Sequence, residues 1–417
     1  MQSIIGITYR KNIPETPAKY TEKSLSIIQS MLDEVIGYTV TLQKLVKNKT
    51  VFIKPNLVRP NPKELPAITT DVRVILGLVR LLHDAGAKQI QVGENPGYQL
   101  AAREAFKLAG LDKSLPKYGA KPVYLDESPA MRIKVPHATV MQEMDLPKPV
   151  LDAEVFINLP KMKTHMHTLV TLGIKNLHGL IYDHERLMFH RNDVAFKVVD
   201  VLRAIRPQLT IVDGIMAMEG QAPLSGKTIP DMNTLIAGTD PVAVDTIGTI
   251  VMGIEPEEVA TNRVAAQSNL GVAKIANIKV LGTPVNQVKR NFKRPIISSV
   301  GVFKNVTVIE GGACNGCLSA LRHTLDKLHH ENKLEAINPI TVYVGIPMPN
   351  VPNINKWTGD IWLFGNCAVN LFAQEKIRNA KPNVVLGCAP HIFDLYKALN
   401  QIRIPQSEIR NNQTKRK

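Results

Sequence analysis

The four cysteines of this 417-residue chain all lie in its last quarter. Cys314 and Cys317 form a C-x-x-C pair in GGACNGCL, while Cys367 and Cys388 follow the short apolar runs IWLFGN and NVVLG. Four thiolates suit a tetrahedral Zn²⁺ or an iron–sulfur cluster. In a reducing compartment, cysteines are more often metal ligands or catalytic groups than disulfides. The chemistry that these residues predict is metal or cluster binding.

The spacing of the cysteines favours a cluster over zinc. Zinc ribbons usually present two C-x-x-C pairs, whereas here the second pair is split by the length of a strand and a helix. Glycines stand in every cysteine loop, which lets backbone N–H groups approach the sulfur atoms: Gly311, Gly312, Gly316, Gly365 and Gly387. We expect an iron–sulfur cluster, [4Fe–4S] or related, on the four cysteines. Structural zinc and unligated or redox-active thiols remain as alternatives.

A second set of residues that could bind a ligand or take part in catalysis lies in KMKTHMHTLVTLGIKNLHG, residues 161–179. Lys161, Lys163 and His165 alternate, so in an extended chain they point to one side, and His167 continues the row. Lys175 follows after the glycine of the next turn, together with Asn176 and His178. Ammonium groups bind carboxylate or phosphate as point charges. The segment therefore predicts a cationic pocket for an anionic ligand.

Two other interpretations of this segment stay open. His165 and His167 could ligate a metal together with His184 or His190, because imidazole is a common ligand. The segment could also be a solvated basic loop, as charge runs usually are. In the pocket interpretation His165 is the candidate proton donor, since its ordinary pKa of about 6.5 lies near neutrality.

Strands and helices alternate through the chain and place these residues at strand ends. Strands are expected at 49–57, 88–95, 121–126, 152–160, 208–214 and 232–238, and helices at 70–86, 98–110 and 240–253. Asp240, followed by proline, is expected to cap the last of these helices. This order is typical of an α/β fold with a largely parallel sheet. The strand ends also carry Lys54, Asn56, Glu94, Asn95 and Asp213, in line with ligand binding at the carboxyl edge of such a sheet.

A basic segment with little periodicity, residues 284–299, is a plausible connector. Beyond it, strand-like runs resume at 305–314, 340–349, 360–367 and 383–390. We therefore expect two domains, an α/β domain over residues 1–295 and a smaller α/β domain over residues 296–417 that carries the cysteines.

The amino-acid composition limits the kinds of partner that the protein is expected to bind. The formal charge is +15, from 51 Lys and Arg against 36 Asp and Glu, which favours acidic ligands or partners. Nucleic acid is disfavoured, because aromatic residues make up only 5% and no basic stripe is interleaved with stacking residues. No apolar run is long enough to span a membrane, and the first residues lack the features of a signal peptide. We expect a cytoplasmic protein.

Read together, these pieces resemble the DUF362 family, whose function is unassigned and whose members are often associated with iron–sulfur clusters. The resemblance rests on VFIKPNLV, VGENPG, INLPKMKTHMHTLVTLGIKNLHGLI, IVDGIMAMEGQAPLSG and IAGTDPVAVDTIG, which span roughly residues 50–250. The positions that fall on the family pattern are Lys54, Asn56, Lys161, Lys163, Thr164, His165, Lys175, Asn176 and Asp213. The ferredoxin-like module of many relatives is missing from this sequence, and the dispersed cysteines could replace it. GQAPLSG also departs from the Gly-Pro pair of relatives.

The combined expectation is an iron–sulfur redox or electron-transfer protein that acts on, or docks, an anionic small molecule or a redox partner protein. His165 and Lys163 would be catalytic, and the ligand would be bound by Lys54, Asn56, Lys161, Thr164, Lys175, Asn176 and Asp213. One alternative is a non-redox metal-dependent enzyme for an acidic metabolite, with structural zinc on the cysteines. Another is a non-catalytic metal-binding or assembly protein.

Overall fold

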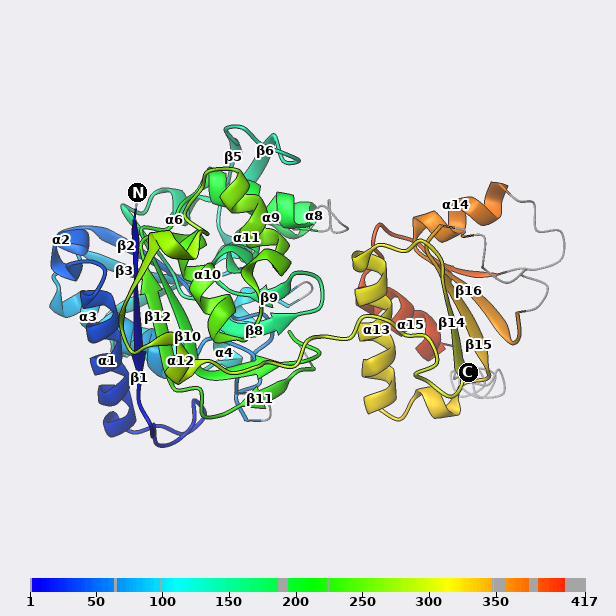
Figure 1. The fold of residues 1–417 in the computed structure, drawn as a ribbon, viewed down its shortest axis with the longest axis horizontal. Coiled ribbons are helices and arrows are strands. Elements are labelled where there is room, and N and C mark those ends of the chain that lie inside the picture. Colours follow the sequence, from blue (N-terminus) through cyan, green and yellow to red (C-terminus); the bar gives the residue numbers. More distant parts are fainter. Residues whose placement is uncertain are drawn as a thin grey trace, which may run out of the picture. The chain divides into compact units, whose positions relative to one another are not determined.

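The computed structural model describes residues 2–63, 66–97, 100–186, 194–223, 225–346, 348, 357–374 and 382–401. The chain forms two compact units, which meet in sequence between Pro295 and Ile296. Each unit has its own sheet (Figure 1) and its own apolar core.

The first unit is built on a large sheet whose main path runs β13-β1-β12-β10-β7-β2-β3-β4. Neighbouring strands along β10-β7-β2-β3-β4 are parallel, and β12 is antiparallel to both β10 and β1. Three short strands extend the sheet off this path: β8 and β11 pair with β10, and β9 pairs with β8. The predicted α/β class with a largely parallel sheet is confirmed.

The strands of the first unit are β1 (Ser3–Tyr9), β2 (Thr50–Lys54), β3 (Gln89–Glu94), β4 (Ala120–Tyr124), β7 (Val155–Asn158), β8 (Lys161–His165), β9 (Leu169–Thr171), β10 (Leu209–Glu219), β11 (Lys227–Ile229), β12 (Thr234–Gly238) and β13 (Ile278–Gly282). A separate hairpin pairs β5 (Ala130–Lys134) with β6 (Glu143–Pro147). The helices are α1 (Glu22–Gly37), α2 (Leu42–Val46), α3 (Val72–Asp84), α4 (Ala102–Leu108), α5 (Leu111–Lys117), α6 (Lys148–Leu151), α7 (Gly173–Asn176), α8 (Asp183–Arg186), α9 (Val194–Ala204), α10 (Pro241–Val251), α11 (Ala260–Gln267) and α12 (Val285–Val288).

Helices cover both faces of this sheet because alternate strand residues point to opposite sides. On β12, Leu235 packs into the core formed with α1 and α3, while its neighbour Ile236 packs into the core formed with α10. The strands are buried on both faces, which explains why their sequences read as continuous apolar runs.

Two helix starts follow the capping signals in the sequence. The Asp240 carboxylate accepts the backbone N–H groups of Val242 and Ala243, with Pro241 in the first turn of α10. This confirms the predicted capping role of Asp240. Asp71 caps α3 in the same manner by accepting the Arg73 N–H.

The second unit is a parallel sheet in the order β14-β15-β16-β17 with helices packed against it. Its strands are β14 (Val306–Glu310), β15 (Ile340–Val344), β16 (Asp360–Phe364) and β17 (Asn383–Val385), and its helices are α13 (Asn315–His330), α14 (Asn366–Gln374) and α15 (Ile392–Gln401). α13 and α15 contribute Leu321, Leu325 and Leu395 to the core beneath the sheet. All strands run the same way, so their carboxyl ends meet at one edge.

Candidate functional site

A pocket of about 100 Å³ lies at the carboxyl ends of β2 and β3 and beside β8. Basic side chains predominate among its polar walls, and a single carboxylate accompanies them in the lining. The charged and imidazole side chains of the lining are Lys54, Lys163, Lys175, Arg186, His165, His178 and Glu94, and the amides are Asn56, Asn95 and Asn176. Six of the nine residues expected at the site, Lys54, Asn56, Lys163, His165, Lys175 and Asn176, therefore line one pocket.

A buried ion pair forms the floor on one side. The Lys54 ammonium lies 2.8 Å from the Glu94 carboxylate, and both side chains are almost fully buried. Burial is the largest cause that raises the pKa of Glu94, and the Lys54 charge opposes that rise. Gly179 passes directly over the pair, because a Cβ there would lie 2.3 Å from Glu94 Oε1. A side chain at this glycine would disrupt the pair.

Lys163 is held by neutral acceptors instead of a carboxylate. Its ammonium donates to Asn56 Oδ1 at 2.8 Å and to the Ile68 carbonyl at 2.7 Å. Burial is the main cause that lowers the pKa of Lys163 well below its ordinary value, and the charges of Lys175 and Lys161 add to it. An anion in the pocket would favour the charged form of this lysine.

A chain of amides continues from Lys163 to the strand β7. The Asn56 amide donates to Asn176 Oδ1 at 2.9 Å, and the Asn176 amide donates to Asn158 Oδ1 at 2.8 Å. Asn158 in turn donates to the Gly173 carbonyl at 2.8 Å. Because each amide both donates and accepts, the network fixes the side-chain orientations on one side of the pocket.

Lys175 lies on α7, whose start is anchored by a buried carboxylate. Asp245 accepts the Gly173 N–H at 2.6 Å and the Ile174 N–H at 2.9 Å. Burial is the largest cause that lowers the pKa of Lys175 to about 7, followed by the charges of Arg186 and Lys54. Lys175 is half-buried and makes no hydrogen bond or ion pair within the described part of the chain.

Arg186 was not expected from the sequence, yet it is a principal cation of the pocket. It ends α8, is buried, and donates to the carbonyls of Asn95 and Ile181 and to that of Pro96. It also pairs with Asp183 at 3.0 Å. No local pattern marks this arginine, because the chain between α7 and α8 returns to the β3 loop only in the folded protein.

His165 is held in one neutral tautomer. Its Nδ1 accepts the backbone N–H of His167 at 3.0 Å, so the neutral ring carries its proton on Nε2. The two imidazole rings are 5.6 Å apart, while His184 lies elsewhere, beside Asp145. His190 lies outside the described residues.

Three of the expected binding residues lie outside the pocket lining. Lys161 pairs with Asp213 at 2.8 Å, and both side chains are fully buried. Asp213 also accepts the Asp71 N–H at 2.7 Å, so this pair joins β8, β10 and the start of α3. Thr164 donates to the Gly220 carbonyl, on the β10 side of the strand. These contacts hold β8 in place beside the pocket.

The four cysteines lie at the carboxyl edge of the second sheet. Cys314 directly precedes α13, and Cys317 lies in the first turn of that helix. Cys367 lies in the first turn of α14, and Cys388 follows β17. Backbone bonds join the last two loops: Gly365 N–H donates to the Val385 carbonyl, and Asn366 N–H donates to the Gly387 carbonyl.

Contacts between these loops bring sulfur atoms close to glycine. A Cβ at Gly365, whose φ is +92°, would lie 3.0 Å from Cys317 Sγ. The hydrogen bond from Cys317 is the largest cause that lowers the pKa of Cys314 to about 5, and backbone N–H groups at the start of α13 also lower it. Cys314 is thus suited to be a thiolate ligand.

The closeness of possible ligand atoms bears on a zinc site. A tetrahedral zinc site with Zn–S bonds of about 2.3 Å holds its sulfurs about 3.8 Å apart. In the described residues, one group of His, Cys, Asp or Glu side chains has three ligand atoms that all lie within 4.8 Å of one another. This group is Asp145, His184 and Glu185. Among the described residues, no three cysteine sulfurs are therefore as close together as the ligands of a single zinc ion would be.

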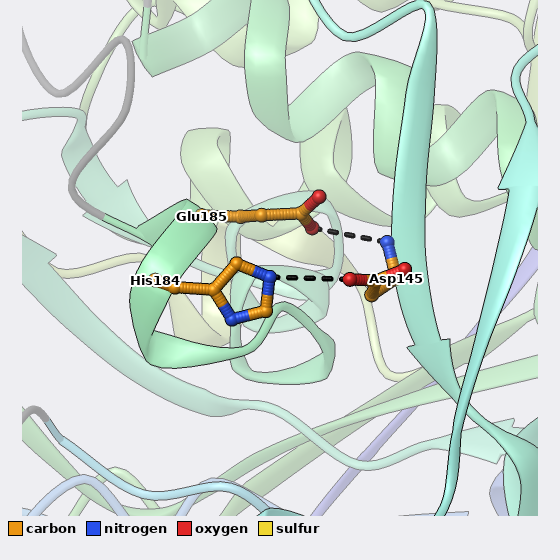
Figure 2. A group of neighbouring side chains, drawn as sticks. All are labelled: Asp145, His184 and Glu185. Atoms are coloured by element: carbon orange, nitrogen blue, oxygen red, sulfur yellow. Dashed lines mark hydrogen bonds and ion pairs between the residues drawn. The ribbon is translucent and has the colours of Figure 1, made fainter.

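The group of Asp145, His184 and Glu185 joins the β5–β6 hairpin to α8 (Figure 2). His184 Nε2 lies 3.1 Å from Asp145, and the Asp145 N–H donates to Glu185 (Figure 2). Arg132 already neutralises both carboxylates, at 2.6 Å from Glu185 and 3.2 Å from Asp145. A metal ion would compete with this guanidinium, so we interpret the group as a structural ion network.

No helix among the described residues combines the length and apolar character needed to cross a bilayer.

Comparison with known proteins identifies relatives of this chain. Residues 51–249 match the family model described as domain of unknown function DUF362. The thylakoid-associated protein sll1697 of Synechocystis sp. is 29% identical over 292 residues, which are 66% of this chain and 88% of the relative.

Two solved structures show limited similarity. The lactate racemase apoprotein from Thermoanaerobacterium thermosaccharolyticum is 14% identical with a TM-score of 0.40, over 61% of this chain and 58% of that chain, which is less than two thirds of its length. A Thermotoga maritima protein solved by the Northeast Structural Genomics Consortium is 12% identical with a TM-score of 0.40, over 92% and 98% of the two chains.

The family match contains every residue that lines the pocket, from Lys54 to Pro223. Over residues 51–249, somewhat less than half of its length, this chain matches the model of the DUF362 family.

Proposed function

We propose that this protein is an iron–sulfur redox protein that docks or acts on a small anionic molecule. The cluster would be held by Cys314, Cys317, Cys367 and Cys388 in the second unit. The anion would be held by the basic pocket of the first unit. The observation that carries the proposal is the arrival of all the cysteine loops at one edge of one parallel sheet.

The surroundings of the cysteines support a cluster. Cys317 is buried, and Cys314 and Leu318 pack against the apolar core of the unit, whereas Cys367 is exposed. The start of α13 directs backbone N–H groups toward Cys314, and these groups stabilise a thiolate. A bound cluster would supply single-electron transfer, while the chain sets its potential through burial and hydrogen bonding.

The pocket supports an anionic ligand. Lys163 and Lys175 have no carboxylate partner in the described residues, while Glu94 is paired with Lys54 and Arg186 with Asp183. Burying such an excess of positive charge is costly unless an anion offsets it. His165 would be the group that exchanges a proton with the ligand, and its neutral ring presents Nε2–H as a hydrogen-bond donor.

The cluster is tested on protein purified under anaerobic conditions. We expect brown protein, a broad visible absorption that dithionite bleaches, and matching amounts of iron and sulfide. Serine at Cys314, Cys317, Cys367 or Cys388 should remove the absorption. Thr324→Ser, a conservative change at a buried position of α13, is the matched control and should retain it.

Colourless protein with one zinc per chain would contradict the cluster. It would favour the alternative, a non-redox metal-dependent enzyme for an acidic metabolite with structural zinc. Colourless protein without metal would favour two other hypotheses. The cysteines would then be unligated or redox-active thiols, or the protein would have a non-catalytic role in metal binding or assembly.

The compartment is part of the proposal. We propose a cytoplasmic protein, while the name of the Synechocystis relative points to the thylakoid as a second location. The charge of +15 would favour an anionic membrane surface over a neutral one. Fractionation of cells, with and without a high-salt wash, separates a surface-bound protein from a freely dissolved one.

A further inference from the structure

We propose that Lys175 is a nucleophilic amine, which condenses with the carbonyl group of a small oxo acid bound in the pocket and forms a Schiff base. This inference rests on the proposed anion-binding role of the pocket and adds the substrate class and a covalent step.

The basic residues of the pocket differ in their partners. Lys54 is paired with Glu94, and Lys163 donates to Asn56 and to a backbone carbonyl. Arg186 is held by Asp183 and by backbone carbonyls. Within the described part of the chain, Lys175 alone of these four makes no hydrogen bond and no ion pair. Its amine is therefore available to a ligand.

The environment of Lys175 favours its neutral form. Burial and the charges of Arg186 and Lys54 lower its pKa to about 7, so roughly half of the amine is unprotonated at neutral pH. An ordinary lysine, with a pKa of about 10.4, is unprotonated on the order of a thousandfold less often. A desolvated lysine near another cation is one recognised way to activate an amine nucleophile.

The backbone that carries Lys175 is held from both sides. Asp245 accepts the N–H groups of Gly173 and Ile174 at the start of α7, and the Asn176 side chain bonds to Asn56 and Asn158. A fixed backbone limits the positions of the amine, which favours attack on a bound carbonyl.

The size and charge of the pocket define the substrate class. A cavity of about 100 Å³ is smaller than the roughly 150 Å³ engineered cavity that accepts benzene, so it fits two- or three-carbon acids. Arg186 keeps Nε without a hydrogen-bond partner in the described structure, and a guanidinium N–H is suited to a carboxylate. In a 2-oxo acid the carbonyl group is adjacent to the carboxylate. If Arg186 binds the carboxylate, the carbonyl carbon is left for attack by Lys175.

The condensation is balanced without an oxidant or a reductant. The Lys175 nitrogen forms a bond to the carbonyl carbon, and the carbonyl oxygen leaves as water together with the two amine hydrogens. Both hydrogens of the water come from the amine, so the step needs no net proton from another group.

The experiment combines trapping with binding. The full-length protein is incubated with pyruvate or glyoxylate and sodium cyanoborohydride, and the modified lysine is located by peptide mass spectrometry. We expect one dominant adduct on Lys175, lost in Lys175→Arg, which keeps the positive charge. Lys121→Arg, at an exposed lysine of β4, is the control and should retain the adduct. In parallel, melting temperatures are measured with pyruvate and with lactate, which lacks the carbonyl.

The outcomes separate the inference from the proposed function. Stabilisation by both acids without a Lys175 adduct would overturn the Schiff base and leave anion docking intact. Neither stabilisation nor adduct would contradict both. Adducts spread over surface lysines and unchanged in Lys175→Arg would also overturn the covalent role. Circular dichroism of the arginine variant shows that loss of the adduct does not come from unfolding.

Discussion

At the scale of single residues, the pocket depends on which lysine has a counter-ion. Lys161 and Lys163 are two positions apart on β8, yet Lys161 is neutralised by Asp213 and Lys163 is not paired with a carboxylate. The neutralised lysine stabilises the strand, while the other lines the pocket. Identical residue types in one short segment therefore have different roles, which are set by long-range partners.

The buried pair of Lys54 and Glu94 gives a prediction at this scale. Glu94→Gln leaves the Lys54 charge buried without its carboxylate, and such a loss typically costs about 3–5 kcal/mol. We expect the free energy of unfolding, measured with urea, to fall by that order. The double variant Lys54→Met with Glu94→Gln removes the unpaired charge and should regain part of the loss. Equal stability of the single variant and the parent would show that the pair is not structurally important.

At the scale of elements, short segments around the pocket are held by buried carboxylates. Asp245 on α10 anchors the start of α7, and Asp213 on β10 anchors the start of α3. Each carboxylate accepts backbone N–H groups that a helix start leaves unpaired. The helices that carry or flank pocket residues are thus fixed by side chains distant in sequence.

Asp245 gives a pH prediction for this anchor. Burial is the main cause that raises its pKa from 3.8 to about 7, so between these values the folded protein holds a proton that the unfolded chain releases. The contribution of this group to stability is fully present below pH 3.8 and is lost as the pH rises to about 7. Asp245→Asn should remove this component, so the difference in unfolding free energy between variant and parent should change with pH from 4.5 to 7.5.

A constant difference across that range would contradict the assigned pKa. Asp152→Asn, on the exposed side of α6, is the control, because its carboxylate pairs only with exposed Lys148 in the described structure.

At the scale of the whole molecule, the two units have separate cores and separate candidate sites. The basic pocket lies in the first unit, and the cysteines lie in the second. Both tryptophans, Trp357 and Trp362, also belong to the second unit, so tryptophan emission reports on that unit. The two sites can therefore be examined independently.

We expect a ligand of the pocket to stabilise the first unit selectively. At a concentration one hundred times its dissociation constant, pyruvate should add about 2.7 kcal/mol to the stability of that unit. Calorimetry should show one transition shifted upward, while the midpoint followed by tryptophan emission stays in place. Cys314→Ser should shift the second transition alone. A joint shift of both transitions would show that the units unfold together.

The sequence by itself determined the alternation of strands and helices, the cap at Asp240, and the position of the candidate ligand-binding residues at strand ends. These features depend on local periodicity and on capping groups next to the helix they serve. The cysteine loops could be placed at one edge because parallel strands share the direction of their carboxyl ends.

Only the tertiary structure decided which polar residues meet. It paired Lys54 with Glu94 and Lys161 with Asp213, brought Arg186 into the pocket, and left Lys175 without a partner in the described residues. Partners of this kind are separated by dozens of residues and are chosen by strand order and loop path, which no local pattern encodes. The burial that sets their charges arises only when those distant segments pack together.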